Sequence, residues 1–463
     1  MNSYFGRVFY SYADKYMITA NIRWDGSSNF ADKHRWGVFP SVSGGWNFRE
    51  ESFIKDVVGD WFSQGKFRAA WGEIGNQNIS SGAYLTRYGN STYYLLGNSM
   101  TPWLSGGRTN VGNPDLRWET TRQLDFGLDL AFFNSALKFN IDYFDRKTSD
   151  MLVQVPMPAA IGLPNTPWSN AGSVKNRGFE FVLDYHGKIG NDFSYNIAGN
   201  ISTYKNKVLS LGGGTNIPGK THLGNQVNTM IEPGKPIGYF YGYKMDGVFQ
   251  TQEEINNYRG GPDNTIIMPT AEPGDLKFVD LNGDGKLGEE DRTMIGNPHP
   301  DFTFGLTLSG EYKGFDLSMF FQGSVGNDIL NILKYDIYSG TGWYNAPKDI
   351  FDKFWTGPGS TNENFAISAN SRDNLTMSEW YIENGSYVRL KNVTLGYTFP
   401  KQWVQKLTVQ NLRLFVAAQN LFTITSYSGL DPELGNSNPA FMGIDMGWYP
   451  QARSFMVGLS LKL

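Results

Sequence analysis

The sequence predicts an all-β protein, a transmembrane antiparallel β-barrel with long extracellular loops. Two observations carry this prediction. Apolar and polar residues alternate in many segments of about ten residues, and these segments are joined by connections that are alternately short and long. A strand that crosses a bilayer needs about nine to eleven tilted residues, with apolar side chains toward lipid and polar ones toward the lumen.

Composition agrees with this fold class and excludes others. The chain has 463 residues, including 25 Tyr, 32 Phe and 54 Gly, and its mean hydropathy is −0.39. It has no apolar run of about 18 residues, which argues against a helical membrane span. The absence of Cys excludes a disulfide framework and a thiolate metal site. The net charge of −4 offers no basic surface for nucleic acid.

The final segment shows the alternation most clearly. Its apolar face carries Phe455, Val457, Leu459, Leu461 and Leu463, and its other face carries Met456, Gly458, Ser460 and Lys462. The same pattern recurs at residues 18–24, 124–130, 137–143, 179–185, 193–201, 302–308, 315–321, 393–399 and 412–418. Weaker runs near residues 4–12, 38–48 and 64–74 bring the expected total to about 13 strands. One such strand alone would also suit the edge of a soluble sandwich.

The connections between these strands give a second, independent indication. Short ones lie at residues 14–15, 133–136, 187–191 and 311–313, and long ones at 75–117, 148–173, 205–300, 323–385 and 422–451. Outer-membrane barrels have short periplasmic turns and long extracellular loops. We therefore expect every long connection outside the cell and the C-terminus in the periplasm.

The odd strand count predicts that this barrel is incomplete. Closed bacterial barrels have an even number of strands, and open sheet edges are costly in lipid. We expect the remaining strands and a plug from upstream sequence or a companion chain, giving a plugged barrel of about 22 strands. Residues 1–5 lack the features of a signal peptide, so we interpret the chain as a fragment or one half of a split barrel.

Several segments carry a resemblance to a known family. Residues 22–30 read IRWDGSSNF, residues 36–43 read WGVFPSVS, and residues 67–77 read FRAAWGEIGNQ. Residues 113–120, 142–148, 170–180, 385–397, 418–422 and 427–433 continue the series. Together they resemble the C-terminal half of the SusC/RagA family of TonB-dependent outer-membrane transporters of Bacteroidota.

This resemblance implies the function and the partners. It implies part of an outer-membrane importer of bulky nutrients, an oligosaccharide or a peptide, and not an enzyme. The implied partners are a SusD-like surface lipoprotein over the extracellular mouth, the upstream barrel and plug portion, and TonB acting through that plug. The alternative is a barrel that has lost import and serves as a scaffold in a larger membrane assembly.

Residues 280–291 match a calcium loop of EF-hand type. Asp280, Asn282 and Asp284 occupy positions 1, 3 and 5, Gly285 occupies the turn, Lys286 offers its carbonyl, and Asp291 replaces the usual Glu at position 12. The alternative is a turn whose side chains cap their own backbone. We predict a structural Ca²⁺ site that fixes the 205–300 loop.

Three tyrosines are the best candidates for substrate contacts. Tyr239, Tyr241 and Tyr243 alternate, so they share one face of a short extended segment. Aromatic rings stack on sugar rings and anchor interfaces, although packing within the loop is the alternative. Other loop aromatics, including Trp168, Trp355, Trp380 and Trp448, are weaker candidates. The four His residues and the adjacent Glu pairs show no metal or catalytic spacing.

Overall fold

A computed structural model describes most of the chain. It leaves out residues 96–101, 155–166, 213–215, 221–225, 339–343, 368–372, 405–408, 437 and 463, and gives only the backbone at residues 90–95, 102–106, 109, 220 and 373. The predicted position of Leu463 thus lies outside the described residues. The chain divides into two compact units, residues 1–217, 232–235 and 306–310, and residues 218–231, 236–305 and 311–463. Each unit is described by itself.

The long strands form a 13-stranded sheet, in the order β1-β2-β3-β4-β7-β8-β11-β12-β21-β22-β25-β26-β28. The first eight are β1 (Asn2–Tyr12), β2 (Tyr16–Gly26), β3 (Trp36–Asn47), β4 (Phe62–Asn76), β7 (Glu119–Phe132), β8 (Leu137–Ser149), β11 (Ser173–Ile189) and β12 (Phe193–Ser210). The others are β21 (Phe302–Tyr312), β22 (Phe315–Val325), β25 (Tyr387–Thr398), β26 (Asn411–Thr425) and β28 (Ser454–Lys462). The predicted antiparallel sheet of about 13 strands is confirmed.

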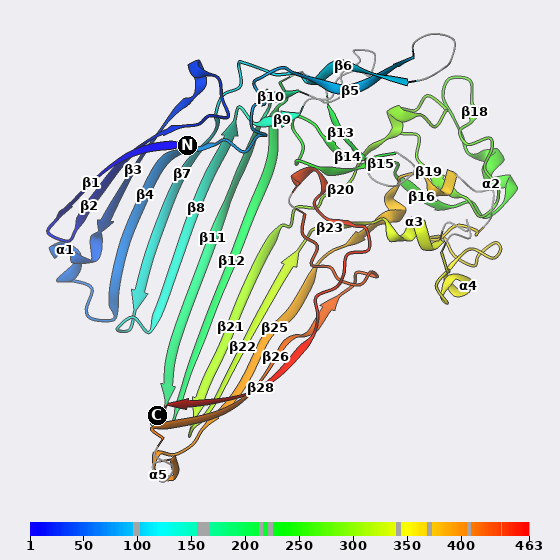
Figure 1. Ribbon diagram of the computed structural model, residues 1–463. Helices are drawn as coiled ribbons and strands as arrows, with labels where there is room; N and C mark the ends of the chain where they lie inside the picture. Colours follow the sequence, from blue (N-terminus) through cyan, green and yellow to red (C-terminus); the bar gives the residue numbers. More distant parts are fainter. Residues whose placement is uncertain are drawn as a thin grey trace. The chain divides into compact units, whose positions relative to one another are not determined.

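The strands of the first unit separate an apolar face from a polar face. On the apolar face Phe126 lies opposite Tyr143, and Tyr143 opposite Phe179, along the neighbouring strands β7, β8 and β11 (Figure 1). The rings of Tyr143 and Phe179 are 5.1 Å apart, and both Phe126 and Phe179 are exposed. On the polar face Arg68 lies 2.8 Å from Asp129 and 2.9 Å from Asp142. The predicted alternation of apolar and polar side chains is therefore present.

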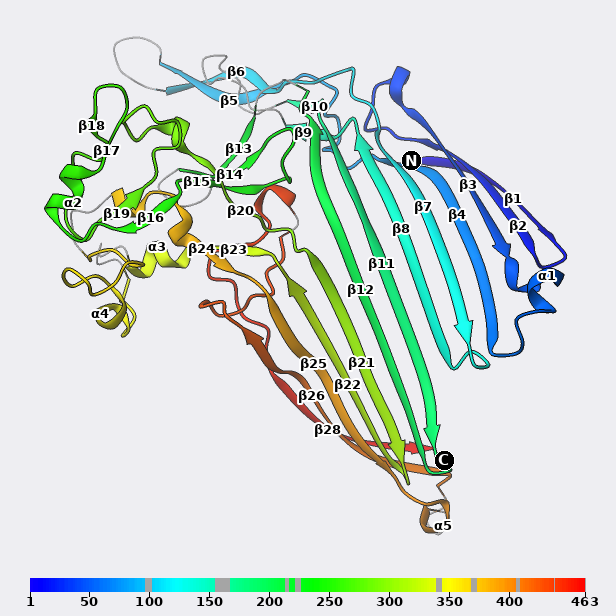
Figure 2. The same ribbon diagram turned by 180° about the vertical axis from the view of Figure 1, so that it is seen from behind.

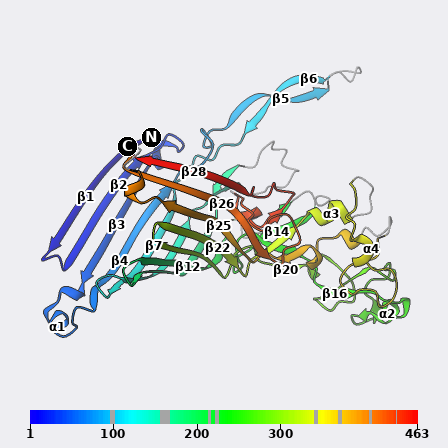
Figure 3. The ribbon, with the colours of Figure 1, turned by 90° about the horizontal axis from the view of Figure 1, so that it is seen from below.

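Tight turns join strands where the sequence predicts short connections. Asp14, Asn134 and Ser135 have positive φ values of 54°, 54° and 63°, a conformation that Asp and Asn tolerate better than most residues. The modest turn after β3 contains the short helix α1 (Ser52–Lys55). Figure 3 shows β1 to β4 as successive strands of this unit.

Strands β22, β25, β26 and β28 of the second unit repeat the same pattern. Figure 2 shows β22, β25 and β26 side by side. Leu414 and Val416 of β26 lie opposite Leu459 and Val457 of β28, and all four are exposed. The predicted apolar face of the final strand is thus formed.

Short elements make up the long connections. In the first unit these include β5 (Arg87–Leu95), β6 (Pro102–Asn110), β9 (Leu152–Gln154) and β10 (Trp168–Asn170). In the second they include β14 (Val227–Ile231), β15 (Tyr239–Gly242), β16 (Met245–Val248), α2 (Gln252–Asn257), β19 (Leu276–Phe278), β20 (Thr293–Gly296), β23 (Asp328–Asn331), α3 (Leu333–Tyr338), α4 (Ile350–Lys353), β24 (Ile382–Asn384) and β27 (Ile444–Asp445). The modest connection between β25 and β26 contains α5 (Lys401–Val404). Within the described residues, no helix has the length and apolar character to cross a membrane.

The longest connection differs in length from the prediction. It was expected at residues 205–300, but β12 continues to Ser210 and β21 begins at Phe302. The connection therefore spans residues 211–301. Its apolar residues share one hydrophobic core with those of residues 330–381 and with Ile444, and this core includes Phe240, Phe249, Phe278, Leu330, Phe365 and Tyr381.

Candidate functional site

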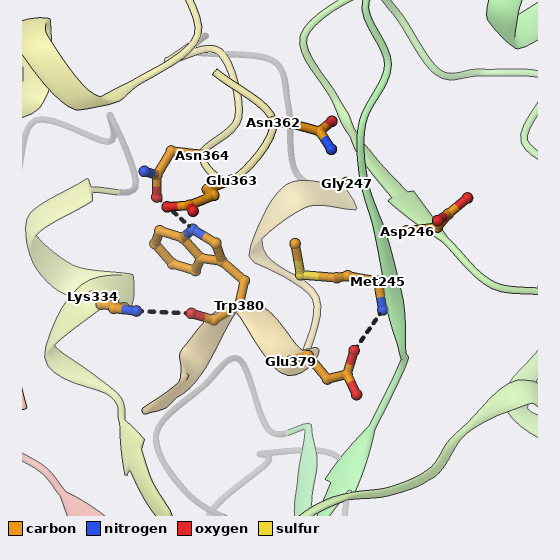
Figure 4. Close-up of a pocket in the computed structure, with 9 residues that line it drawn as sticks. All are labelled: Met245, Asp246, Gly247, Lys334, Asn362, Glu363, Asn364, Glu379 and Trp380. Atoms are coloured by element: carbon orange, nitrogen blue, oxygen red, sulfur yellow. Dashed lines mark hydrogen bonds between the residues drawn. The ribbon is translucent and has the colours of Figure 1, made fainter. Parts of the chain in front are cut away.

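A polar hollow of about 500 Å³ lies beside Trp380 in the second unit (Figure 4). Segments far apart in the sequence line it, namely β16, α3, residues 362–364 and residues 379–380. The lining residues are Met245, Asp246, Gly247, Lys334, Asn362, Glu363, Asn364, Glu379 and Trp380. Carboxylates and amides predominate among them, so the hollow offers mainly hydrogen-bonding groups.

Backbone hydrogen bonds fix the β16 side of this hollow. The amide of Tyr243 donates to the Met377 carbonyl, and the amide of Glu379 donates to the Tyr243 carbonyl, both at 3.0 Å. The Glu379 carboxylate then accepts the amide hydrogen of Met245 at 2.9 Å (Figure 4). The carboxylate thus holds the start of β16 against the segment that carries Trp380.

Because Gly247 has no side chain, Asn362 on the opposite wall of the hollow can lie close to its backbone. Its φ is +91°, and a Cβ at this position would lie 2.4 Å from Oδ1 of Asn362. The same Asn362 oxygen accepts the amide hydrogen of Val248 at 2.9 Å. A side chain at position 247 would therefore be strained and would displace Asn362.

Trp380 forms a wall of the hollow. Its indole N–H donates to Oδ1 of Asn364 at 3.0 Å, and Nζ of Lys334 lies 5.0 Å from its ring centroid. Trp380 is 6% exposed and packs on Phe365, with ring centroids 4.9 Å apart. Most of the ring is therefore covered by protein, and a ligand would meet only its edge.

Charges around the hollow are balanced by nearby partners. Nζ of Lys334 lies 2.9 Å from the Glu383 carboxylate. Burial alone would raise the pKa of Glu383, but Lys334 and the hydrogen bonds from Ser428 hold it below the ordinary value. Nζ of Lys277 lies 2.8 Å from Asp246. Burial would lower the pKa of Lys277, and Asp246 reverses that effect and raises it. The site is thus built to stay charged and ordered near neutral pH.

The three predicted tyrosines lie in β15 and directly after it, just before β16 of the hollow. Tyr239 is 2% exposed, Tyr243 is 8% exposed, and Tyr241 is half-buried. The guanidinium of Arg292 lies 4.9 Å from the ring of Tyr241 and 5.7 Å from that of Tyr243. Burial raises the pKa of Tyr243. Tyr241 is therefore the accessible member of the three, and their role in substrate binding stays a prediction.

The predicted calcium loop is closed by its own hydrogen bonds. Asp280 accepts the amide hydrogens of Gly283 and Gly285, at 2.7 and 2.8 Å. The fully buried Asp291 accepts those of Leu281, Asn282 and Gly288, at 2.8, 3.2 and 2.8 Å. Asn282 and Asp284 cap the amides of Asp284 and Lys286 in the same way.

These hydrogen bonds are the ones expected if residues 280–291 form a turn whose side chains cap their own backbone, which was the alternative to a calcium site. Within the described ranges, no three acidic or His side chains converge on one point suited to a metal ion. Asp280, Asn282, Asp284, Lys286 and Asp291 do lie on one compact loop, and calcium binding there stays a prediction.

Comparison with known proteins identifies the family. The family described as "TonB dependent receptor-like, beta-barrel" matches residues 1–421. The chain belongs to the TonB-dependent receptor β-barrel family. TonB-dependent receptor P3 of Formosa agariphila is 37% identical over 476 residues, which cover 99% of this chain and 45% of that protein. TonB-dependent receptor SusC of Bacteroides thetaiotaomicron is 32% identical, with 99% and 43% covered.

A solved structure agrees with this family. The structure of the RagAB peptide transporter matches with a TM-score of 0.81 and 24% identity, covering 99% of this chain and 47% of that one. The chain spans about half the length of the curated relatives it matches. Its relatives are TonB-dependent receptors and not enzymes, and the chain is an outer-membrane β-barrel protein. In such barrels the apolar face meets lipid and the long connections lie outside the cell.

Sequence reasoning found only part of the hollow. Trp380 was among the aromatic loop residues, whereas Lys334, Asn362, Glu363 and Glu379 were missed. They come together from segments up to 134 residues apart, as in the contact between Met245 and Glu379. No local spacing signals such a site, because its members come from four segments that are far apart in the sequence.

Proposed function

We propose that this chain forms part of the barrel of a TonB-dependent importer that carries bulky nutrients across the outer membrane. The observation that supports this most is the 13-stranded antiparallel sheet with an apolar outward face, in a chain whose family match covers residues 1–421. The relative SusC and the RagAB peptide transporter suggest an oligosaccharide or a peptide as the substrate class.

The rest of the importer would complete the sheet. Within the described residues, β1 has only β2 as a neighbour in the sheet, and β28 has only β26. All eleven residues of β1 are exposed, including Phe5 at 85%. Open strand edges are costly in lipid. We propose that these edges pair with strands of an upstream or companion portion, which also supplies the plug that TonB engages.

A SusD-like lipoprotein would cover the extracellular mouth. The second unit presents exposed apolar side chains on its connections, among them Phe351 at 84% and Tyr449 at 90%. Large apolar side chains in contact with water favour an interface with a partner. The hollow beside Trp380, with Tyr241 nearby, would then contact the substrate through carboxylate and amide groups that bind hydroxyl or peptide groups.

Uptake in cells tests this proposal. Bacteria that lack this chain, bacteria that lack TonB and the parent strain would be given fluorescent oligosaccharides and fluorescent peptides of similar mass. An importer predicts that both deletions abolish uptake of the same substrate and that the restored gene rescues it. Unchanged uptake in a strain that lacks the chain, with altered composition of an outer-membrane complex, would support the scaffold alternative and contradict import.

The variants Glu363→Gln and Asn362→Ala test whether the hollow contacts the substrate. Both side chains are exposed and line the hollow. Reduced uptake is expected at low substrate concentration and normal uptake at saturation. Asp263→Asn, an exposed change in the connection of residues 211–301, serves as the control. Equal effects of all three variants would argue against the hollow as the substrate contact.

A further inference from the structure

Four cations form a row across four neighbouring strands of the first unit. Arg122 of β7 lies opposite Lys147 of β8, Lys147 opposite Lys175 of β11, and Lys175 opposite Lys207 of β12. The next row toward the middle of the strands adds Arg177 and Lys205, which also lie opposite each other. These six residues, Arg122, Lys147, Lys175, Arg177, Lys205 and Lys207, are the cationic rows.

The cationic rows lie on the apolar face, beyond the row of Phe126, Tyr143 and Phe179. Residues four apart on a strand share a face, so Arg122, Lys147 and Lys175 share the face of Phe126, Tyr143 and Phe179. A rise of about 3.3 Å per residue places the two rows roughly 7 and 13 Å beyond those rings. Strands β7, β8, β11 and β12 meet the long connections at this end (Figure 1). The rows therefore lie outside the cell, where the lipid chains give way to headgroups.

Few acidic groups accompany these cations. Glu73 lies 2.7 Å from Arg122, and Asp145 lies 2.7 Å from Lys175. Asp145 also lies opposite Arg177 in the register of β8 and β11. In the described part of the chain, Lys147, Arg177, Lys205 and Lys207 form no ion pair with an acidic side chain, and all four are exposed. Like charges directly opposite each other on a sheet are destabilising. The arrangement is stabilised once an anion of high charge density lies across the strands.

We propose that the cationic rows bind the phosphate groups of the phosphorylated glycolipid in the outer leaflet of the outer membrane. Three features support this ligand. The rows are continuous with the lipid-facing surface, they lie at headgroup depth, and they spread positive charge over four adjacent strands. A phosphate offers several acceptor oxygens that Arg and Lys bind with charge-assisted hydrogen bonds. The site is independent of the transported substrate.

Binding of lipid A to the assembled barrel tests this proposal. The barrel, with its partners, would be extracted from outer membranes, and affinities would be measured by native mass spectrometry. Each cation near a membrane surface contributes roughly fivefold in affinity, so Lys147→Gln, Lys205→Gln and Lys207→Gln together should weaken binding about a hundredfold. The matched control combines Lys66→Gln, Lys138→Gln and Lys188→Gln, which removes equal charge from the polar face of the sheet.

The lipids compared identify the ligand. Phosphorylated lipid A should bind to the parent protein and the control variant with equal affinity, and dephosphorylated lipid A should bind much more weakly to both. Heat-dependent migration on a gel verifies that each variant is folded. Equal binding of dephosphorylated lipid A, equal binding of phosphatidylglycerol, full competition by millimolar inorganic phosphate, or an equal loss in the control variant would each overturn the proposal.

Discussion

Arg389 and Asp431 form a buried ion pair with a separation of 2.5 Å. Their side chains are 4% and 7% exposed, and Arg389 also lies 2.7 Å from Glu433. Asp431 accepts a further hydrogen bond from the amide of Gln451 at 2.8 Å. The Asp431 carboxylate thus holds the connection of residues 426–453 against β25 near both of its ends.

Replacement of Arg389 should release this connection. Arg389→Gln leaves the buried Asp431 without its cation, which costs about 3–5 kcal/mol for a buried pair. The half-buried Glu433 keeps Lys391 at 2.8 Å. The chain has no Cys, so Tyr449→Cys, at a residue that is 90% exposed, gives a unique site for a spin label. We expect the label to become markedly more mobile in the Arg389→Gln variant.

Arg453 provides the control for this experiment. It is an exposed arginine two residues beyond Gln451. Arg453→Gln removes the same charge and should leave the mobility of the label unchanged. Equal mobility in the two variants would show that the buried pair does not hold the connection.

The ion pair between Arg389 and Asp431 should weaken at low pH. Burial alone would raise the pKa of Asp431, but hydrogen bonds from Arg389 and from two backbone amides lower it below 3.8. A carboxyl whose pKa is depressed by folding stabilises the structure above its unfolded value and loses that contribution as the pH falls through its folded value. The label at position 449 should stay immobile from neutral pH to about pH 4 and become mobile below the ordinary value. An Asp431→Asn variant should lack this transition.

A charge on the apolar face should impair assembly. Phe126 is 40% exposed on that face, and a Lys at the bilayer midplane of a β-barrel costs about 2–4 kcal/mol. We expect Phe126→Lys to reduce the amount of heat-modifiable, folded barrel in the outer membrane. Gln123→Lys, on the polar face of the same strand, should assemble normally. Equal yields would contradict the assignment of the two faces.

Calcium binding to residues 280–291 can be measured directly. Isothermal calorimetry on the assembled barrel should detect Ca²⁺ binding at millimolar concentration or below, and Asp280→Asn should weaken it. Asp263→Asn, an exposed change outside the loop, should bind normally. If the parent protein takes up no Ca²⁺ at millimolar levels, the hydrogen bonds of Asp280 and Asp291 to the backbone are the loop's whole function.

The strands were predictable because their signal is local. A period of two residues, as in Phe179 and Phe181, assigns each side chain to a face before any partner strand is known. The turns were equally local, since Asp14 and Asn134 adopt the left-handed conformation with little help from the rest of the chain. The antiparallel order then follows from the short connections.

The site was less predictable because it depends on contacts between distant segments. The alternation of the three tyrosines predicts that they share one face of an extended segment, but it does not predict what covers that face. Arg292 lies over two of the rings, and Tyr239 and Tyr243 are buried. The cationic rows were also missed. Arg122, Lys147, Lys175 and Lys207 are ordinary surface charges in sequence and become a row only once the strand register is known.

The shared core of the second unit limits how its binding surface can be altered. Tyr243 from one connection donates its amide hydrogen to Met377 from a second, and Leu330 from the second pairs with Ile444 from a third. A loop transplanted alone from a relative would leave these partners without matching surfaces. Anyone who wishes to exchange specificity between such receptors must therefore move residues 211–301, 326–386 and 426–453 together, as a single cassette.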